Sequence, residues 1–363
     1  MYRYKAIRKK WVMGLSNFAY DYNNNNPGNT KAKKNNSCYS GYYSYNNQYS
    51  YSQNLCYMNS SVQCLSHLVE FRNWILSMNL DTNKTLLKAA KKLFSQMNNE
   101  KDPEESSVLE IKAEIGKLDN RFNTNEQQDA SEFISFFIGK LLEETQGTKK
   151  NINSLEEELK ELNELEKEGF SRLYKRFFLK KGKSYIVDLF YGILKVETRD
   201  IKDDNLISVS FNMFNILELP IYYLDKKYIS IKLETILENT FGGKKYNEDG
   251  KTYAITIIHR LPKNLIILFN RTVNNIHLDL TILYKKTLDM NAYCPAKKEE
   301  IKDKNIFNLC GIIEYKTYNG KSGHYTATCL NDSQWYLFND SYIYEEDDIE
   351  NLKNAMILFY ERK

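Results

Sequence analysis

A cysteine at position 56 stands where an Asn-rich stretch gives way to a helix-like spacing of apolar residues. Asn54 can accept a hydrogen bond from an early backbone N–H, so we expect it to cap a helix that begins near Cys56. The positive end of such a helix favours the thiolate, which is the nucleophilic form of cysteine. A small buried core cysteine explains the residue equally well when it is considered alone. A catalytic role therefore requires a partner elsewhere in the chain.

The partner of a nucleophilic thiol is a base within hydrogen-bond reach, itself oriented by a third group. The chain has four histidines. His67 would lie about 16 Å from Cys56 along the same helix, which is too far. His259 and His277 have the positions of strand-end or surface residues. His324 follows a loop containing Gly and Ser and begins a strand, so it is the expected base.

The strand that begins at His324 is followed by a short polar turn and a second strand, a pattern that predicts a hairpin. We expect Leu330 to pair with Trp335 across the turn. In that register His324 and Asn339 are diagonal neighbours on one face, close enough for their side chains to meet. Asp340 would face the other way, but a slip of one residue exchanges the two roles. Asn339 is the expected orienting residue, and Asp340 is the alternative.

The rest of the chain has helix patterns first and strand patterns later. Its 363 residues are 42% hydrophobic and 27% charged, which is typical of a globular protein with a sizeable core. Thr124 with Gln127 forms a capping-box pattern, and Gly169 is expected to end a charged helix. Strand patterns begin at about Ile186. This order predicts an α+β fold with two packed lobes.

Charge and cysteine spacing argue against several classes of protein. The net charge of +4 argues against nucleic-acid binding as the main function. No apolar run reaches the roughly 18 residues of a membrane-spanning helix. The six cysteines include no C-x-x-C pair, so neither a disulfide scaffold nor a thiolate zinc site is expected. We expect reduced thiols, a cytosolic or nuclear location, and no cofactor.

Several sequence blocks resemble the ubiquitin-specific proteases, which are papain-like deubiquitinases. They occur in the family's order over nearly the whole chain. The blocks are similar to the cysteine box (54–65), the Q-Q-D-A-x-E-F block (127–133), the L-P-x-x-L strand (261–268), the histidine box (323–327 and 335–341) and the C-terminal strand (355–360).

This resemblance implies a papain-like fold with a helical thumb, a β-rich palm and fingers. It also implies hydrolysis of the bond after the C-terminal glycine of ubiquitin, with ubiquitin and ubiquitinated proteins as partners. Cys56 would attack the carbonyl, His324 would activate it and protonate the leaving amine, and Asn339 would orient His324. The residues implied to contact the basic tail of ubiquitin are Gln127, Asp129 and Glu132, with Tyr325 lining its channel.

The chain departs from the family pattern in the fingers and beside the tail channel. The family usually carries two zinc-binding C-x-x-C pairs, whereas the segments 196–205 and 244–253 contain no cysteine. We therefore expect shortened fingers without zinc. Thr272 stands where the family usually has an aromatic residue, which alters one wall of the tail channel.

The cysteine box itself is split. The family places an oxyanion-hole Asn five residues before the cysteine, where this chain has a tyrosine, yet residues 14–18 match the first half of the box. The Asn/Tyr-rich stretch 20–53 then reads as a low-complexity insertion, expected to be disordered or loosely ordered. Asn17 is the expected oxyanion donor. The catalytic domain is expected over 14–363, after a basic segment, 1–13.

Two other functions remain open on the sequence. A ubiquitin-binding scaffold with little or no hydrolysis is compatible with the split box. The altered channel at Thr272 is compatible with the same scaffold, and a protease of a ubiquitin-like modifier is a third possibility. A ubiquitin probe with a C-terminal electrophile separates the three, because only the deubiquitinase forms a covalent adduct with it.

Overall fold

The structure is a computed structural model. It describes residues 11–15, 18–20, 42–45, 48–52, 54–80, 83–99, 105–146, 162–181, 184–221, 229–273, 276–278, 280–294, 305–318, 322–350 and 352–363. The chain divides into two compact units: unit 1 comprises Met1–Lys140 and Cys310–Ile349, and unit 2 comprises Leu141–Leu309 and Glu350–Lys363. Among the described residues, no helix has the length and apolar character needed to cross a membrane.

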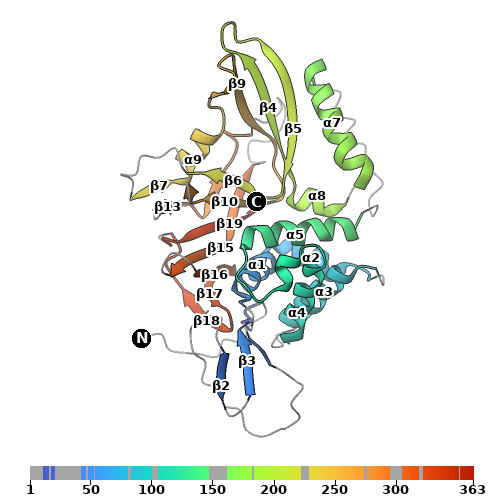
Figure 1. Ribbon diagram of the computed structural model, residues 1–363, viewed down its shortest axis with the longest axis vertical. Coiled ribbons are helices and arrows are strands. Elements are labelled where there is room, and N and C mark those ends of the chain that lie inside the picture. The colour runs from blue at the N-terminus through green and yellow to red at the C-terminus, as the bar shows by residue number, and fades with distance from the viewer. Residues whose placement is uncertain are drawn as a thin grey trace. The chain divides into compact units, whose positions relative to one another are not determined.

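Unit 1 contains the helices of the N-terminal half (Figure 1). They are α1 (Cys56–His67), α2 (Val69–Ser77), α3 (Thr85–Asn98), α4 (Glu105–Gly116), the 3-10 helix η1 (Asn120–Asn123) and most of α5 (Ala130–Glu144). Every residue of α1 is buried, so this helix forms the centre of the unit. Leu68 has an extended backbone between α1 and α2, which makes the first apolar stretch a helix pair.

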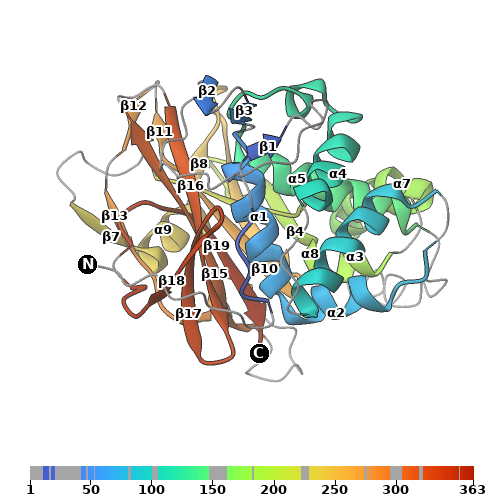
Figure 2. The ribbon, with the colours of Figure 1, turned by 90° about the horizontal axis from the view of Figure 1, so that it is seen from below.

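Antiparallel strands form the other half of unit 1. Their order is β18 (Tyr342–Glu346), β17 (Gln334–Asn339), β16 (Ser322–Asn331) and β15 (Ile306–Tyr318), whose first residues belong to unit 2. Leu330 pairs with Trp335, which confirms the predicted hairpin register. Helix α1 runs alongside β16 (Figure 2). Cys56, at the start of α1, and His324, near the start of β16, therefore lie in the same unit.

Part of the Asn/Tyr-rich insertion forms a sheet, which corrects the expectation of disorder for that part. Strand β1 (Phe18–Tyr20) pairs with β3 (Gln48–Ser52), and β3 also pairs with β2 (Tyr42–Tyr45). Tyrosine favours strands, and a backbone ladder satisfies the peptide groups without an aliphatic core. Phe18 lies opposite Ser52, so the two ends of the insertion are paired with each other.

Unit 2 contains most of the remaining elements. Its helices are α7 (Glu164–Lys181), α8 (Tyr185–Phe190) and α9 (Leu233–Thr240). One sheet has the order β5 (Leu206–Phe214), β4 (Gly192–Asp200), β9 (Thr252–Arg260), β8 (Lys245–Tyr246), with α7 packed along β5 (Figure 1). A second group has the order β19 (Ala355–Arg362), β10 (Asn264–Asn270), β6 (Leu217–Pro220).

Short strands complete unit 2. The paired segments are β13 (Thr281–Leu283) with β7 (Ser230–Lys232), β11 (Thr272–Val273) with β12 (Ile276–His277), and β14 (Thr287–Asp289) with the first residues of β15. The side chains of Thr272 and His277 lie outside the described part of the chain, so the expected change to the channel wall stays a prediction.

Two expectations for unit 2 are wrong. Gly169 does not end a helix, because α7 continues through it; a Cβ at this position would lie 2.4 Å from the carbonyl oxygen of Val209, so the glycine permits close packing on β5. Residues 186–190 are helical, since Ser184 caps α8 by accepting a hydrogen bond from the backbone N–H of Ile186. The apolar run there was too short for its periodicity to distinguish strand from helix.

Candidate active site

The candidate nucleophile, Cys56, is the first residue of α1 and is buried. Asn54 does not cap this helix, which corrects the expectation from the sequence. Leu55 occupies the cap position without a side-chain cap, and Asn54 has a left-handed backbone with φ of 47°. Its side-chain amide donates instead to the carbonyl oxygen of Asn125 at 2.7 Å. Asparagine tolerates left-handed backbone better than most residues, so it suits the bend that leads into α1.

His324 joins Cys56 and Asn339. Its Nε2 lies 2.6 Å from Oδ1 of Asn339, and a further hydrogen bond links His324 to Cys56. Burial lowers the pKa of His324, but the hydrogen bond to Cys56, the charges of Asp340 and Cys56, and the hydrogen bond to Asn339 together raise it to about 9. The imidazole is therefore protonated at neutral pH beside the thiol. The structure brings the three expected residues together within unit 1.

Asp340 also faces His324, contrary to the expectation that it points away. Strand β17 ends at Asn339, and Asp340 has a left-handed backbone with φ of 50°, which removes it from the strand alternation. Its Oδ2 lies 4.0 Å from Nε2 of His324, while its Oδ1 accepts a hydrogen bond from Nδ2 of Asn59 at 2.8 Å. Asn339 thus makes the direct hydrogen bond to the base, and Asp340 acts through its charge.

The segment Gly14–Leu15 lies against the same turn. The backbone N–H of Leu15 donates to the carbonyl oxygen of Asp340 at 3.0 Å, and Nδ2 of Asn59 lies 3.4 Å from the carbonyl oxygen of Leu15. A Cβ on Gly14 would lie 2.5 Å from the carbonyl oxygen of Ser341, so only glycine fits this approach. The first half of the split box is therefore held beside the turn that follows β17.

Asn17, the expected oxyanion donor, lies outside the described residues. In the segment before it, Trp11, Val12, Met13 and Leu15 are buried. Trp11 packs edge-on against Phe94, and the guanidinium of Arg72 lies 4.7 Å from its ring centroid. The boundary drawn at Gly14 stays a prediction, but Trp11, Val12 and Met13 are buried residues of unit 1.

The loop before α5 carries two of the expected tail-binding residues. Asp129 caps α5, because its Oδ1 accepts hydrogen bonds from the backbone N–H groups of Ser131 (2.7 Å) and Glu132 (3.0 Å). The predicted capping box at Thr124 is therefore wrong. The Thr124 hydroxyl instead forms hydrogen bonds within the turn that precedes α5. The amide of Gln127 bonds to the backbone of Gly323, the residue before His324.

Two tyrosines lie near Cys56 and Asp129. The rings of Tyr315 and Tyr325 are 4.5 Å apart between centroids. Burial raises the pKa of both phenols, and the negative charge of Asp129 raises each further. Asp129 and Tyr325, both expected to contact the substrate tail, are thus neighbours in unit 1.

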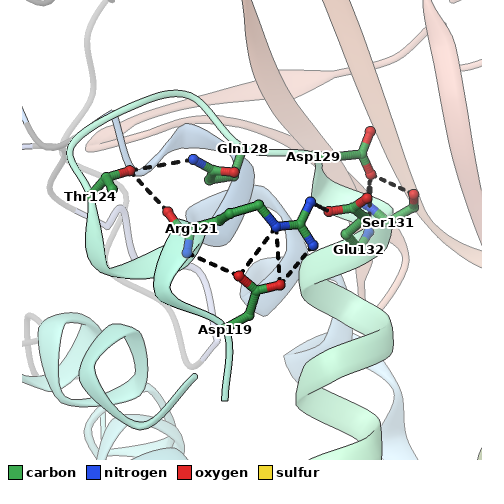
Figure 3. Close-up of polar contacts among 7 residues, drawn as sticks. All are labelled: Asp119, Arg121, Thr124, Gln128, Asp129, Ser131 and Glu132. Carbon is green, nitrogen blue, oxygen red and sulfur yellow. Dashed lines mark hydrogen bonds and ion pairs between the residues drawn. The ribbon is translucent and has the colours of Figure 1, made fainter. Parts of the chain in front are cut away.

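Glu132 is the third of the polar residues expected at the tail site. Its carboxylate is paired with an arginine of the chain itself (Figure 3). Nη1 of Arg121 lies 2.7 Å from Oε2 of Glu132, and Nη2 lies 2.7 Å from Oδ2 of Asp119. The side chains of Arg121 and Glu132 are 53% and 45% exposed, so solvent screens this pair and it exchanges readily. Glu132 is therefore accessible to a basic ligand in competition with Arg121.

The remaining described histidines have structural surroundings. His67 is buried with Nδ1 2.8 Å from the carbonyl oxygen of Gln63, and burial lowers its pKa to about 4. His259 lies beside Phe170 and Phe211 in unit 2. Among the described residues, no group of three His, Cys, Asp or Glu side chains is arranged to hold a metal ion. The expected absence of zinc stays a prediction.

Asn59 was missed by the sequence analysis. It lies three residues after Cys56 on the same helix and bonds to both Asp340 and Leu15. The signal was present, because residues three apart share a helix face and a buried polar side chain needs partners. Its partners could not be identified, since they lie far from it in the sequence.

Comparisons with known proteins agree with this geometry. The family model described as "Ubiquitin carboxyl-terminal hydrolase" matches residues 49–360. Human ubiquitin carboxyl-terminal hydrolase 2 is 27% identical over 335 residues, which cover 85% of this chain and 54% of that protein. Ubiquitin carboxyl-terminal hydrolase Usp2 of Drosophila melanogaster is 25% identical over 332 residues, covering 85% of this chain and 34% of that protein. The chain thus spans about half, or less, of the length of these relatives.

A solved structure shows the same fold. The SAGA Ubp8/Sgf11/Sus1/Sgf73 DUB module bound to ubiquitin aldehyde contains a chain that matches with a TM-score of 0.64 and 20% identity, covering 99% of this chain and 71% of that one. The fold is therefore the α+β, papain-like fold of the ubiquitin-specific proteases. Since the family model covers well over half of the sequence and its cysteine and histidine blocks meet in one unit, the chain belongs to the ubiquitin carboxyl-terminal hydrolase family.

Proposed function

We propose that this chain is a thiol-dependent deubiquitinase that hydrolyses the peptide or isopeptide bond after the C-terminal glycine of ubiquitin. The observation that carries the proposal is the hydrogen-bonded set of Cys56, His324 and Asn339, with His324 linked to both of the others. A papain-like protease needs this arrangement of nucleophile, base and orienting group. Family membership supports ubiquitin as the partner.

The chemistry follows from the protonation of His324. With its pKa raised to about 9, His324 is a cation at neutral pH and stabilises the Cys56 thiolate. The thiolate sulfur attacks the carbonyl carbon, and His324 then gives its proton to the leaving amine as the C–N bond breaks. Neutral His324 next removes a proton from water, which attacks the thioester and releases the carboxylate and the thiol. Asn339 holds the imidazole in the required orientation.

The tail of the substrate would lie along Asp129, Glu132 and Tyr325. Asp129 and Tyr325 are neighbours, and the Glu132 carboxylate is exposed. A basic peptide tail complements these carboxylates. Binding of the tail to Glu132 would replace the ion pair with Arg121.

The oxyanion would be stabilised by Asn17. Support comes from the residues on either side of it: Leu15 bonds to the turn at Asp340, and Phe18 pairs with Ser52, four residues before Cys56. Removing one oxyanion donor typically lowers kcat by about 100- to 1,000-fold. Asn17→Ala should therefore show such a loss with little change in KM. Unchanged turnover would exclude the assignment.

A ubiquitin probe carrying a C-terminal electrophile tests the function. The native chain should form a covalent adduct, and Cys56→Ala should form none. Cys64→Ala is the matched control, because Cys64 is a buried thiol on the same helix that faces Cys329 rather than His324. Binding without an adduct would indicate a ubiquitin-binding scaffold. Labelling only by a probe made from another modifier would indicate a protease of that modifier.

We also propose a cytosolic or nuclear location. The five cysteines within the described residues are all free thiols, as expected where thiols are kept reduced. Localisation of a tagged chain in cells tests this proposal, and export into an oxidising compartment would contradict it.

A further inference from the structure

The side chain of Gln127 is bonded to the peptide groups of a single residue far away in the sequence. Its Nε2 donates to the carbonyl oxygen of Gly323 at 2.7 Å, and its Oε1 accepts from the Gly323 N–H at 3.1 Å. Both hydrogen-bonding groups of the Gln127 amide are thereby engaged. Gly323 is followed directly by His324, the candidate base.

This contact occurs where β16, within the described part of the chain, has a neighbouring strand on one side only. The pairing of β17 with β16 begins at Ala327, whereas Gly323 pairs only with Thr317 of β15 in the described sheet. An adjacent antiparallel residue would exchange one N–H and one carbonyl bond with Gly323. The Gln127 amide supplies the same donor and acceptor, so it takes the place of the missing strand residue.

Gly323 is also constrained by the ring of Tyr315. A Cβ on Gly323 would lie 2.3 Å from Cζ of Tyr315, closer than real atoms approach. Gly323 is therefore held by an aromatic ring and by the Gln127 amide. Any movement of this peptide would move the backbone of His324.

The same loop is tied to the segment that carries the nucleophile. The carbonyl oxygen of Asn125 accepts the hydrogen bond from Asn54, two residues before Cys56. Oδ1 of Asn125 accepts a second bond from Nζ of Lys112 at 3.2 Å, and Lys112 is buried. Residues 125–127 thus contact the chain immediately before both Cys56 and His324.

We propose that Gln127 is a positioning residue, which holds Gly323 and thereby sets His324 opposite Cys56. The inference rests on the proposed function for the roles of Cys56 and His324, but it does not depend on which substrate is cleaved. It adds a role to the one that the family resemblance implies for Gln127. The two bonds to Gly323 use one N–H and one lone pair of the Gln127 amide, and a second N–H and a second lone pair remain.

The test separates positioning from tail binding with two measurements. Gln127→Met keeps the length of the side chain and removes both hydrogen bonds. With a ubiquitin C-terminal fluorogenic amide, we expect kcat to fall by roughly 10- to 100-fold, the loss that a misplacement on the order of 1 Å can cause. KM should change by less than about threefold, because tail binding is retained.

The second measurement needs no ubiquitin. Alkylation of Cys56 by iodoacetamide, followed by peptide mass spectrometry across a pH series, reports the thiolate that His324 stabilises. In Gln127→Met the alkylation profile should move to higher pH. This measurement still decides the positioning role if the chain proves not to cleave ubiquitin.

The controls are two further variants. Gln128→Met is the matched control, because the Gln128 amide bonds only weakly within its own loop, to Thr124 at 3.4 Å, and should leave both measurements unchanged. Gln127→Glu keeps the acceptor for the Gly323 N–H, so it provides a second variant if the methionine form does not fold. A raised KM with unchanged kcat and alkylation would overturn the inference, as would no change in any of them.

Discussion

Two regions of this molecule join distant segments of the chain through side chains, and they do so by different chemistry. In unit 1, the segments around Cys56 and His324 are joined by buried amide groups and by close backbone approach. In unit 2, the turns at the end of the sheet formed by β5, β4, β9 and β8 are joined by charges. Asp204 contacts the Tyr253 hydroxyl and lies 3.3 Å from Lys244, whose ammonium is 4.2 Å from the Tyr253 ring.

The contacts in the two regions differ in solvent exposure and in directionality. The Lys244 and Asp204 side chains are 50% and 62% exposed, so water and salt weaken their attraction. The amide contacts in unit 1 are partly buried and directional, so they restrict both distance and angle. Catalysis needs positional accuracy, whereas these exposed turns need only to stay together.

The largest effect is expected where backbone approaches backbone in unit 1. Gly14→Ala would place a Cβ 2.5 Å from the Ser341 carbonyl oxygen and displace the segment bonded to Asp340. We expect a loss of about 1–3 kcal/mol in the free energy of unfolding and a lower kcat/KM. Urea denaturation and steady-state kinetics measure the two effects.

Gly243→Ala in unit 2 is its matched control. The nearest atom to that Cβ would be 3.8 Å away, so we expect a change within about 0.5 kcal/mol. Equal losses in the two variants would remove the distinction between the regions.

A charge also acts in unit 1, through Asp340. Its charge is one of the causes that raise the pKa of His324 to about 9, so kcat/KM should fall as pH rises through that value and the imidazolium loses its proton. Asp340→Asn removes the charge and keeps both an acceptor for Asn59 and a residue suited to left-handed backbone. The descending limb of the pH profile should therefore move to lower pH. Asp332→Asn, also left-handed but exposed in the hairpin turn, should leave the profile in place.

A smaller effect is expected from the exposed ion pair at the tail site. Arg121→Gln frees Glu132 and removes a positive charge that competes with a basic tail. Because solvent screens an exposed ion pair, KM for a ubiquitin substrate should fall by no more than about fivefold, with kcat unchanged. Lys117→Gln, which removes an exposed charge paired with Glu114, is the control for net charge. An increase in KM would show that Arg121 assists binding instead.

The smallest effect is expected at the turns of unit 2. Lys244→Ala removes an exposed ion pair and a cation–π contact, so we expect a loss of roughly 0.5–1 kcal/mol in the free energy of unfolding and no change in kcat. The loss should shrink in 1 M salt, where charges are screened within about 3 Å. A loss that persists in salt would mean that packing, rather than charge, joins these turns.

The sequence alone was sufficient to predict those residues of the candidate site whose partners follow from a local pattern of neighbouring residues. Cys56 begins a helix, His324 lies two residues after the start of a strand, and the Leu330–Trp335 register places Asn339 beside His324. These features depend on periodicity and turn length, which a sequence displays directly. The α+β order of the elements follows from the same patterns.

Other features could not be predicted because they depend on tertiary contact or on a single backbone angle. The left-handed backbone of Asp340 turns its carboxylate toward His324, and no pattern of neighbouring residues indicated this. The pairing of Gln127 with Gly323 joins residues 196 positions apart. Gly169 has the sequence appearance of a helix end, but its packing on Val209 keeps it inside α7.

The pairing of β1 with β3 has a practical consequence for protein engineering. Because Phe18 pairs with Ser52, the segments at the two ends of the Asn/Tyr-rich insertion lie next to each other in unit 1. Doubling the length of the insertion costs only about 0.6 kcal/mol of closure entropy. We therefore expect that inserting a reporter domain or a binding module into this tract, or replacing the tract by a two-residue turn, leaves the surroundings of Cys56 unchanged.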